Sequence, residues 1–146
     1  MMESNSPMIQ RIKLILIIIT VIIVFMVPYG YHVDVGPGPN GLMAITWELP
    51  ETYGLMILSA LEYFIYYLYR LVVLRGMWRL LNGAISSRRF MVHGLVSEII
   101  PLLISIPGVL FLSSEGENYI PIMIPIPILL LYCGFVVIYL RTQSET

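Results

Sequence analysis

The sequence predicts an all-α membrane protein, a bundle of four transmembrane helices that forms a single integral membrane domain over residues 1–146. Hydrophobic residues make up 58% of the chain and charged residues 12%, and the mean hydropathy is +0.87. Soluble proteins are about half apolar and about a quarter charged, so this composition is typical of a membrane protein. The apolar residues gather in four stretches, at about 12–28, 53–75, 90–112 and 119–140. Each stretch is close to the roughly 20 residues that a helix needs to cross a bilayer.

The basic residues predict the orientation of these four spans. All eight flank the same ends of the stretches: Arg11, Lys13, Arg70, Arg75, Arg79, Arg88, Arg89 and Arg141. The other connections carry only acidic residues: Asp34, Glu48 and Glu51 in one, and Glu115 and Glu117 in the other. Lys and Arg in short loops stay on the cytoplasmic side during insertion. We therefore expect a multi-pass protein of the cell membrane with its N- and C-termini in the cytoplasm.

The first two spans have clear ends. The first is an Ile-rich block closed by Pro28, and it lacks the cleavage site of a signal peptide, so we expect a retained helix. The second begins near Tyr53, after Pro50. Its helical character extends past the apolar part to Leu81, where Asn82–Gly83 is a typical stop.

Capping residues and prolines define the last two spans. Ser86 or Ser87 is a suitable N-cap for the third helix. The fourth stretch opens with Pro121, Pro125 and Pro127, which remove backbone donors. The sequence therefore predicts extended or distorted backbone there, and a regular helix only from about Ile128.

The segment between the first two spans, residues 29–51, shows the alternation of a strand. Tyr31 and Val33 alternate with polar residues, and so do Ile45 and Trp47 on the far side of a Gly- and Pro-rich turn. This pattern predicts a short β-hairpin, and an irregular loop anchored by Trp47 in the membrane interface is the alternative.

Polar residues inside the predicted spans define a candidate buried polar network. Its members are Ser59, Glu62, Tyr66, Arg70, Ser97, Glu98 and Ser105. Those of the second helix recur at spacings of three and four, and those of the third lie on a stripe of small and polar residues. Such stripes allow close helix contact in a membrane, so we expect the two stripes to face each other.

The ionisable members of this network are the most informative, because a charge at the membrane centre costs about 3 kcal/mol. Arg70 and Glu98 have similar expected depths, which favours a buried ion pair. Snorkelling of Arg70 to the headgroups is the alternative. Glu62 has no cation at its depth, so we expect it to be protonated, with either a structural or a proton-coupling role.

The sequence favours no catalytic, metal or cofactor site. Cys133 is a lone cysteine in an apolar run, and the two histidines, His32 and His93, fall at opposite ends of the membrane. The net charge of −1 does not favour a nucleic-acid partner. We expect a non-catalytic subunit, adaptor or sensor module that contacts the lipid bilayer and forms a homo-oligomer or binds a partner membrane protein. A small oligomeric proton- or solute-coupled transporter, with Glu62 as the coupling acid, is the alternative.

Overall fold

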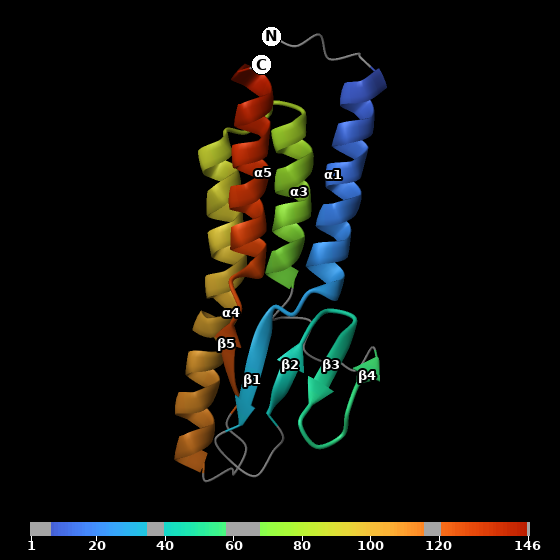
Figure 1. Cartoon of the computed structure of the whole chain (residues 1–146). Coiled ribbons are helices and arrows are strands. Elements are labelled where there is room, and N and C mark those ends of the chain that lie inside the picture. Colours follow the sequence, from blue (N-terminus) through green and yellow to red (C-terminus); the bar gives the residue numbers. More distant parts are fainter. Residues whose placement is uncertain (1–6, 35–39, 58–67, 116–120, 146) are drawn as a thin grey trace.

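The computed structural model describes residues 7–34, 40–57, 68–115 and 121–145. The described helices are α1 (Pro7–Met26), α3 (Leu71–Leu81), α4 (Ser87–Glu115) and α5 (Ile128–Glu145), with a 3₁₀ helix, η2 (Leu68–Arg70), before α3. The strands are β1 (Gly30–Asp34), β2 (Gly41–Met43), β3 (Trp47–Pro50), β4 (Met56–Ile57) and β5 (Pro121–Pro125). The helices lie side by side, and the strands lie beyond one end of α1, α3 and α5 (Figure 1).

The five strands form one antiparallel sheet in the order β4-β3-β2-β1-β5. The segment expected to form a hairpin, residues 29–51, contributes three of these strands, β1, β2 and β3, and β4 follows it. Its second arm is interrupted at residues 44–46, which separate β2 from β3. The last strand comes from the far end of the chain: Ile124 of β5 pairs with Tyr31 of β1.

The prediction of a four-span, all-helical, multi-pass membrane bundle is wrong. Among the described residues, α1 is the one helix that is long and apolar enough to cross a membrane. The described part of the second expected span contains β4, η2 and the eleven-residue α3, and the fourth expected span begins with β5. Apolar strands and apolar helices give the same hydropathy signal, which is why the sequence alone did not separate them.

Local signals set several of the helix ends. α3 ends before Asn82, and Gly83 adopts a left-handed backbone with φ +70°. At the start of α4, the Arg89 backbone N–H donates to Ser86 Oγ at 3.4 Å, so Ser86 is the N-cap. α5 begins at Ile128, directly after the proline run. These three predicted ends are confirmed.

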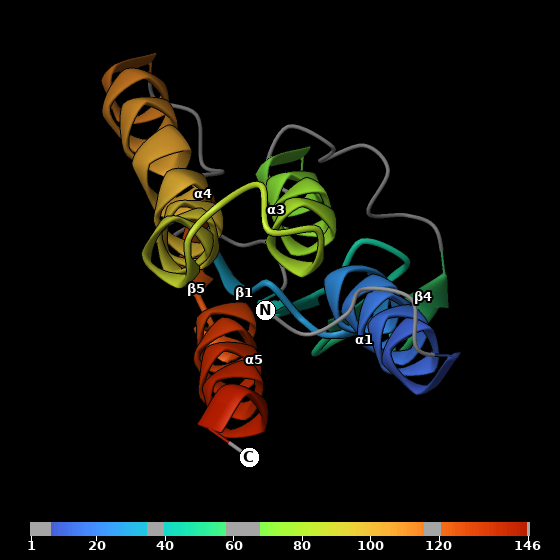
Figure 2. The same ribbon diagram turned by 90° about the horizontal axis from the view of Figure 1, so that it is seen from above.

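The core joins the helical layer to the sheet. α4 extends past the other helices and packs along β5, and it also contacts α3 and α5 (Figure 1). Seen along the helix axes, α3 lies between α1 and α4 (Figure 2). A hydrogen bond ties α5 to α1, because the Tyr132 hydroxyl lies 2.8 Å from Thr20 Oγ1. Buried Tyr29, Met43 and Met123 continue the core into the sheet.

Candidate functional site

Arg70 is the most unusual buried residue, because its large charged side chain is completely enclosed at the junction of helices and sheet. Its Nη1 donates to the carbonyl oxygens of Val27 at 2.8 Å and Val24 at 3.3 Å. These carbonyls lie at the C-terminal end of α1, where the helix itself supplies no partner. The partial negative charge of a helix C-terminus also attracts a cation. Arg70 therefore caps α1.

Groups from the sheet complete this cap. The Thr46 backbone N–H and Oγ1 both donate to the Phe25 carbonyl, at 3.3 and 3.0 Å. The Trp47 indole Nε1 donates to the Met26 carbonyl at 2.8 Å. The end of α1 is thus bonded to two distant segments, the turn between β2 and β3, and Arg70. Sequence reasoning placed Trp47 in a hairpin arm or in the membrane interface, and no local signal identifies its backbone partner.

Glu98 of α4 lies at the N-terminal end of α5, where backbone N–H groups, and not carbonyl groups, lack partners within the helix. Its carboxylate is 4% exposed, and Oε1 accepts the Leu129 backbone N–H at 3.0 Å. The Leu130 backbone N–H also lies near this carboxylate and favours its charged form. Both amides belong to the first helical turn, whose donors lack partners within the helix. A negative charge is favourable at the positive end of a helix, so Glu98 caps α5.

The structure places Arg70 and Glu98 on two different helix ends, close enough for each charge to act on the other through space. No bidentate pair forms between them: Arg70 Nε and Nη2 and Glu98 Oε2 have no hydrogen-bond partner among the described residues. Arg70 also lies over the Tyr29 ring, 5.9 Å from its centroid, within the range of a cation–π contact. Arg70 is turned into the protein instead of out toward headgroups.

The rest of the predicted polar network is only partly described. Ser97 is buried on α4, and its hydroxyl donates to the Gly94 carbonyl at 2.7 Å in the same helix. Ser105 lies in α4, but its side chain lies outside the description. Ser59, Glu62 and Tyr66 lie outside the described residues. The transporter alternative depends on Glu62 and stays a prediction.

Gly94, a member of the small-residue stripe of α4, faces α5. A Cβ atom added at Gly94 would lie 2.9 Å from Cys133 Sγ of α5. Cys133 itself is completely buried. Gly94 therefore lets α4 approach α5 closely, and α4 also packs against α3. The predicted contact with the polar stripe of the second helix depends on Ser59, Glu62 and Tyr66, which lie outside the described residues. Small residues allow close approach in either case, and they do not specify the partner.

An exposed polar pair lies on the sheet side of this junction. The Tyr31 hydroxyl of β1 donates a short hydrogen bond to the Glu51 carboxylate, just after β3. This hydrogen bond, together with desolvation and the nearby negative charge, raises the pKa of Tyr31 above its ordinary value of 10.0. The pair links two strands that are separated by β2 in the sheet.

No group of three or more His, Cys, Asp or Glu that could hold a metal ion is found within the described ranges. Comparison with known protein families, with curated proteins and with solved structures gives no match. The functional argument therefore depends on this chain's own geometry. That geometry is a buried charged junction that fixes helix ends, together with a large apolar outer surface.

Proposed function

We propose that the protein is a non-catalytic subunit or adaptor of a membrane complex, attached to the bilayer through α1. The observation that carries this proposal is the outward direction of the apolar side chains of α1. In the most apolar stretch of 18 residues within α1, only 17% is buried against the rest of the protein. The exposed apolar residues of α1 are Met8, Leu14, Ile15, Ile18, Ile19, Val21, Ile22 and Met26. A lipid environment removes the cost of exposing this area to water.

The length and flanks of α1 fit this role. Twenty residues at ~1.5 Å each extend roughly 30 Å, which is enough to cross the hydrocarbon core when the long stems of Arg11 and Lys13 reach back to the headgroups. Arg11 and Lys13 lie in the first turns of α1. Because basic flanks are retained on the cytoplasmic side, the N-terminal end of α1 is cytoplasmic and the sheet lies toward the opposite side.

The outer faces of α4 and α5 supply the contact with a partner. Leu95, Ile99, Leu103 and Ile106 of α4 and Leu131, Phe135 and Ile138 of α5 are exposed. Their spacings of three and four place them on one face of each helix. Contiguous apolar surface of this kind marks an interaction site. The proposed partner is a helix of another membrane protein or of a second copy of the chain.

Alkaline carbonate extraction of membranes from cells that express the full chain tests the attachment. The wild-type chain should stay in the membrane pellet. Ile18→Asp combined with Ile22→Asp should release it, because each acid at the centre of a span costs about 3 kcal/mol. Leu49→Asp, at an exposed apolar position of the sheet, is the matched control and should stay in the pellet.

Release of the wild-type chain by carbonate would show that α1 is not a membrane anchor.

The same membranes, solubilised in a mild detergent, test whether the chain binds a partner. The mass of the intact complex should exceed the 16.6 kDa of one chain after correction for detergent. A monomer of that mass would contradict the subunit role.

A further inference from the structure

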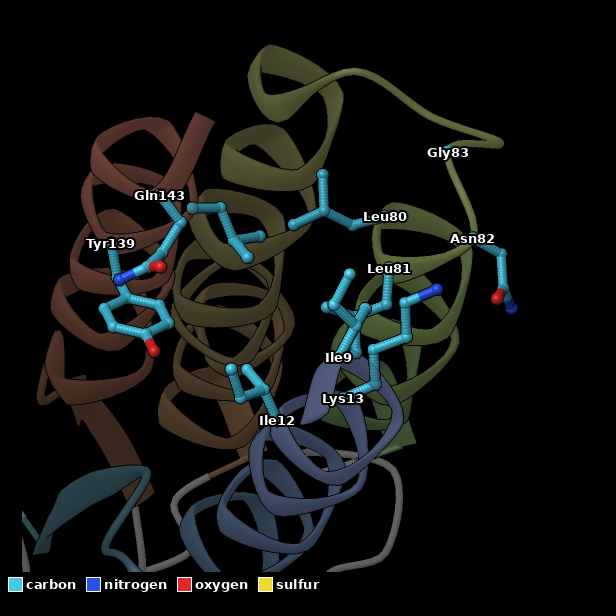
Figure 3. Close-up of a pocket in the computed structure, with 10 residues that line it drawn as sticks. Ile9, Ile12, Lys13, Leu80, Leu81, Asn82, Gly83, Tyr139 and Gln143 are labelled. Carbon is cyan, nitrogen blue, oxygen red and sulfur yellow. The ribbon is translucent and has the colours of Figure 1, made fainter. Parts of the chain in front are cut away.

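A cavity of about 510 Å³ lies between α1, α3 and α5, at the end of the helical layer away from Arg70 (Figure 3). Its walls are mainly aliphatic, with one aromatic ring: Ile9 and Ile12 of α1, Leu80 and Leu81 of α3, and Tyr139 and Leu140 of α5. The volume is within the ~300–1,000 Å³ range of ligand sites. A cavity with such walls fits an apolar chain.

Polar groups gather at the rim of this cavity. Lys13 extends from α1 toward the end of α3, where Asn82 lies, and Gln143 lies on the opposite side, on α5 (Figure 3). Lys13 is half-buried, so its aliphatic stem covers apolar surface while its ammonium group stays at the rim. The site thus combines an apolar interior with a cationic, hydrogen-bonding mouth.

The charge around the mouth selects for an anion. Six of the eight basic residues belong to the helix turns near this end: Arg11, Lys13, Arg79, Arg88, Arg89 and Arg141. Arg75 lies in the middle of α3, and Arg70 is buried at the junction with the sheet. Basic pockets between helices at the cytoplasmic face of a membrane attract anionic headgroups.

We propose that this cavity binds an anionic phospholipid. One acyl chain lies against Ile12, Leu81 and Leu140, and the phosphate faces Lys13 and Asn82. A water-soluble phosphate would leave the aliphatic walls uncovered, and a lipid without net charge would leave Lys13 without a counter-charge. The proposal relies on the proposed function in one respect, since α1 brings this mouth to the level of the headgroups.

Thermal unfolding of the purified full chain in a nonionic detergent tests the site. Phosphatidylglycerol should raise the unfolding temperature at concentrations where phosphatidylcholine with the same acyl chains has no effect. Lys13→Gln should raise the phosphatidylglycerol concentration for half of this effect roughly fivefold, the contribution of one lysine near anionic lipid. Arg88→Gln removes the same charge at the same end but outside the cavity lining, and should raise that concentration less than Lys13→Gln does.

A second variant tests the cavity itself. Ile12→Trp adds bulk at the wall against which the acyl chain lies and should weaken the response to phosphatidylglycerol. Glycerol phosphate alone should give no response in the wild-type chain. Equal responses to both lipids, equal losses in Lys13→Gln and Arg88→Gln, or stabilisation by glycerol phosphate would each overturn the proposal. If carbonate releases the chain but phosphatidylglycerol still stabilises it selectively, only the membrane anchor α1 is rejected. If the chain resists carbonate but responds equally to both lipids, only the lipid site is rejected.

Discussion

Arg70 and Lys13 each lie near the C-terminal end of a helix, but at opposite ends of the helical layer and in different surroundings. Arg70 is completely enclosed, and its Nη1 donates to the carbonyls at the end of α1. Lys13 is half-buried at the rim of a cavity, beside the end of α3. Burial therefore determines what each cation can bind. The buried Arg70 donates to backbone carbonyls within the protein, whereas Lys13 at the open rim is accessible to a ligand.

The largest effect should come from Arg70→Met. This change leaves two carbonyls at the end of α1 without donors and leaves the buried Glu98 carboxylate without its nearby positive charge. We expect the free energy of unfolding in detergent to fall by about 3–5 kcal/mol. Arg75→Met, at an exposed position of α3, is the matched control and should change it by less than about 0.5 kcal/mol. Equal small losses would show that burial does not distinguish these arginines.

Substitution of Glu98 should lower the free energy of unfolding by a smaller amount. Two variants separate the contribution of its charge from the contribution of its hydrogen bond. Glu98→Gln keeps an oxygen that accepts the Leu129 N–H and should cost about 1 kcal/mol through the lost charge at the end of α5. Glu98→Leu also loses the acceptor and should cost about 2–3 kcal/mol. Denaturant titration of both variants measures the difference.

A double-mutant cycle on Arg70→Met and Glu98→Leu decides how far the two charges act as a pair. Each side chain is bonded to a different helix end, so we expect most of the two losses to add, and the double variant to recover only the part due to the uncompensated Glu98 charge, about 1 kcal/mol. Recovery of most of the loss in the double variant would instead show a direct ion pair.

The smallest effect should come from the exposed Tyr31–Glu51 hydrogen bond. The pKa of Tyr31 is raised in the folded chain, so the stability from this bond is present below pH 10.0, the unfolded value, and is lost as the pH rises through the folded value. The difference in phenolate absorbance between wild type and Tyr31→Phe reports this pKa, and Glu51→Gln should lower it. Tyr53→Phe, at an exposed tyrosine, is the control. An unchanged pKa in Glu51→Gln would contradict the bond.

Sequence reasoning worked where the determining chemistry is local. Gly83 can adopt the left-handed backbone that ends α3, Ser86 can bond the first free amide of α4, and a regular helix can begin only after Pro127. Each of these features depends on residues within a few positions of one another. They were predicted without knowledge of the fold.

The sheet could be predicted only in part. Alternation between Tyr31 and Trp47 indicated extended backbone, but pairing of β1 with β5 joins segments about 90 residues apart. Ile122, Met123 and Ile124 are apolar on both faces of β5, so this strand has no alternation to distinguish it from the helix that follows. The continuous apolar run from 121 to 140 therefore gave a single long span.

The role of Arg70 could not be predicted, for a different reason. The sequence shows side chains that can pair with one another, and Glu98 was the only acid at the expected depth. The partners that Arg70 takes in the structure are backbone carbonyls of Val24 and Val27, which every residue possesses. Only the position of a helix end makes such carbonyls available.

The capping of α1 by Thr46, Trp47 and Arg70 also has a mechanical consequence. A helix end that is bonded only to itself can fray or rotate without moving its neighbours, but the last carbonyls of α1 are held by the sheet and by the start of α3. A helix in a bilayer that is thinner than its apolar length responds by tilting. With α1 in a bilayer, as proposed, a tilt of α1 would pull on the β2–β3 turn and so transmit the thickness of the membrane to the sheet.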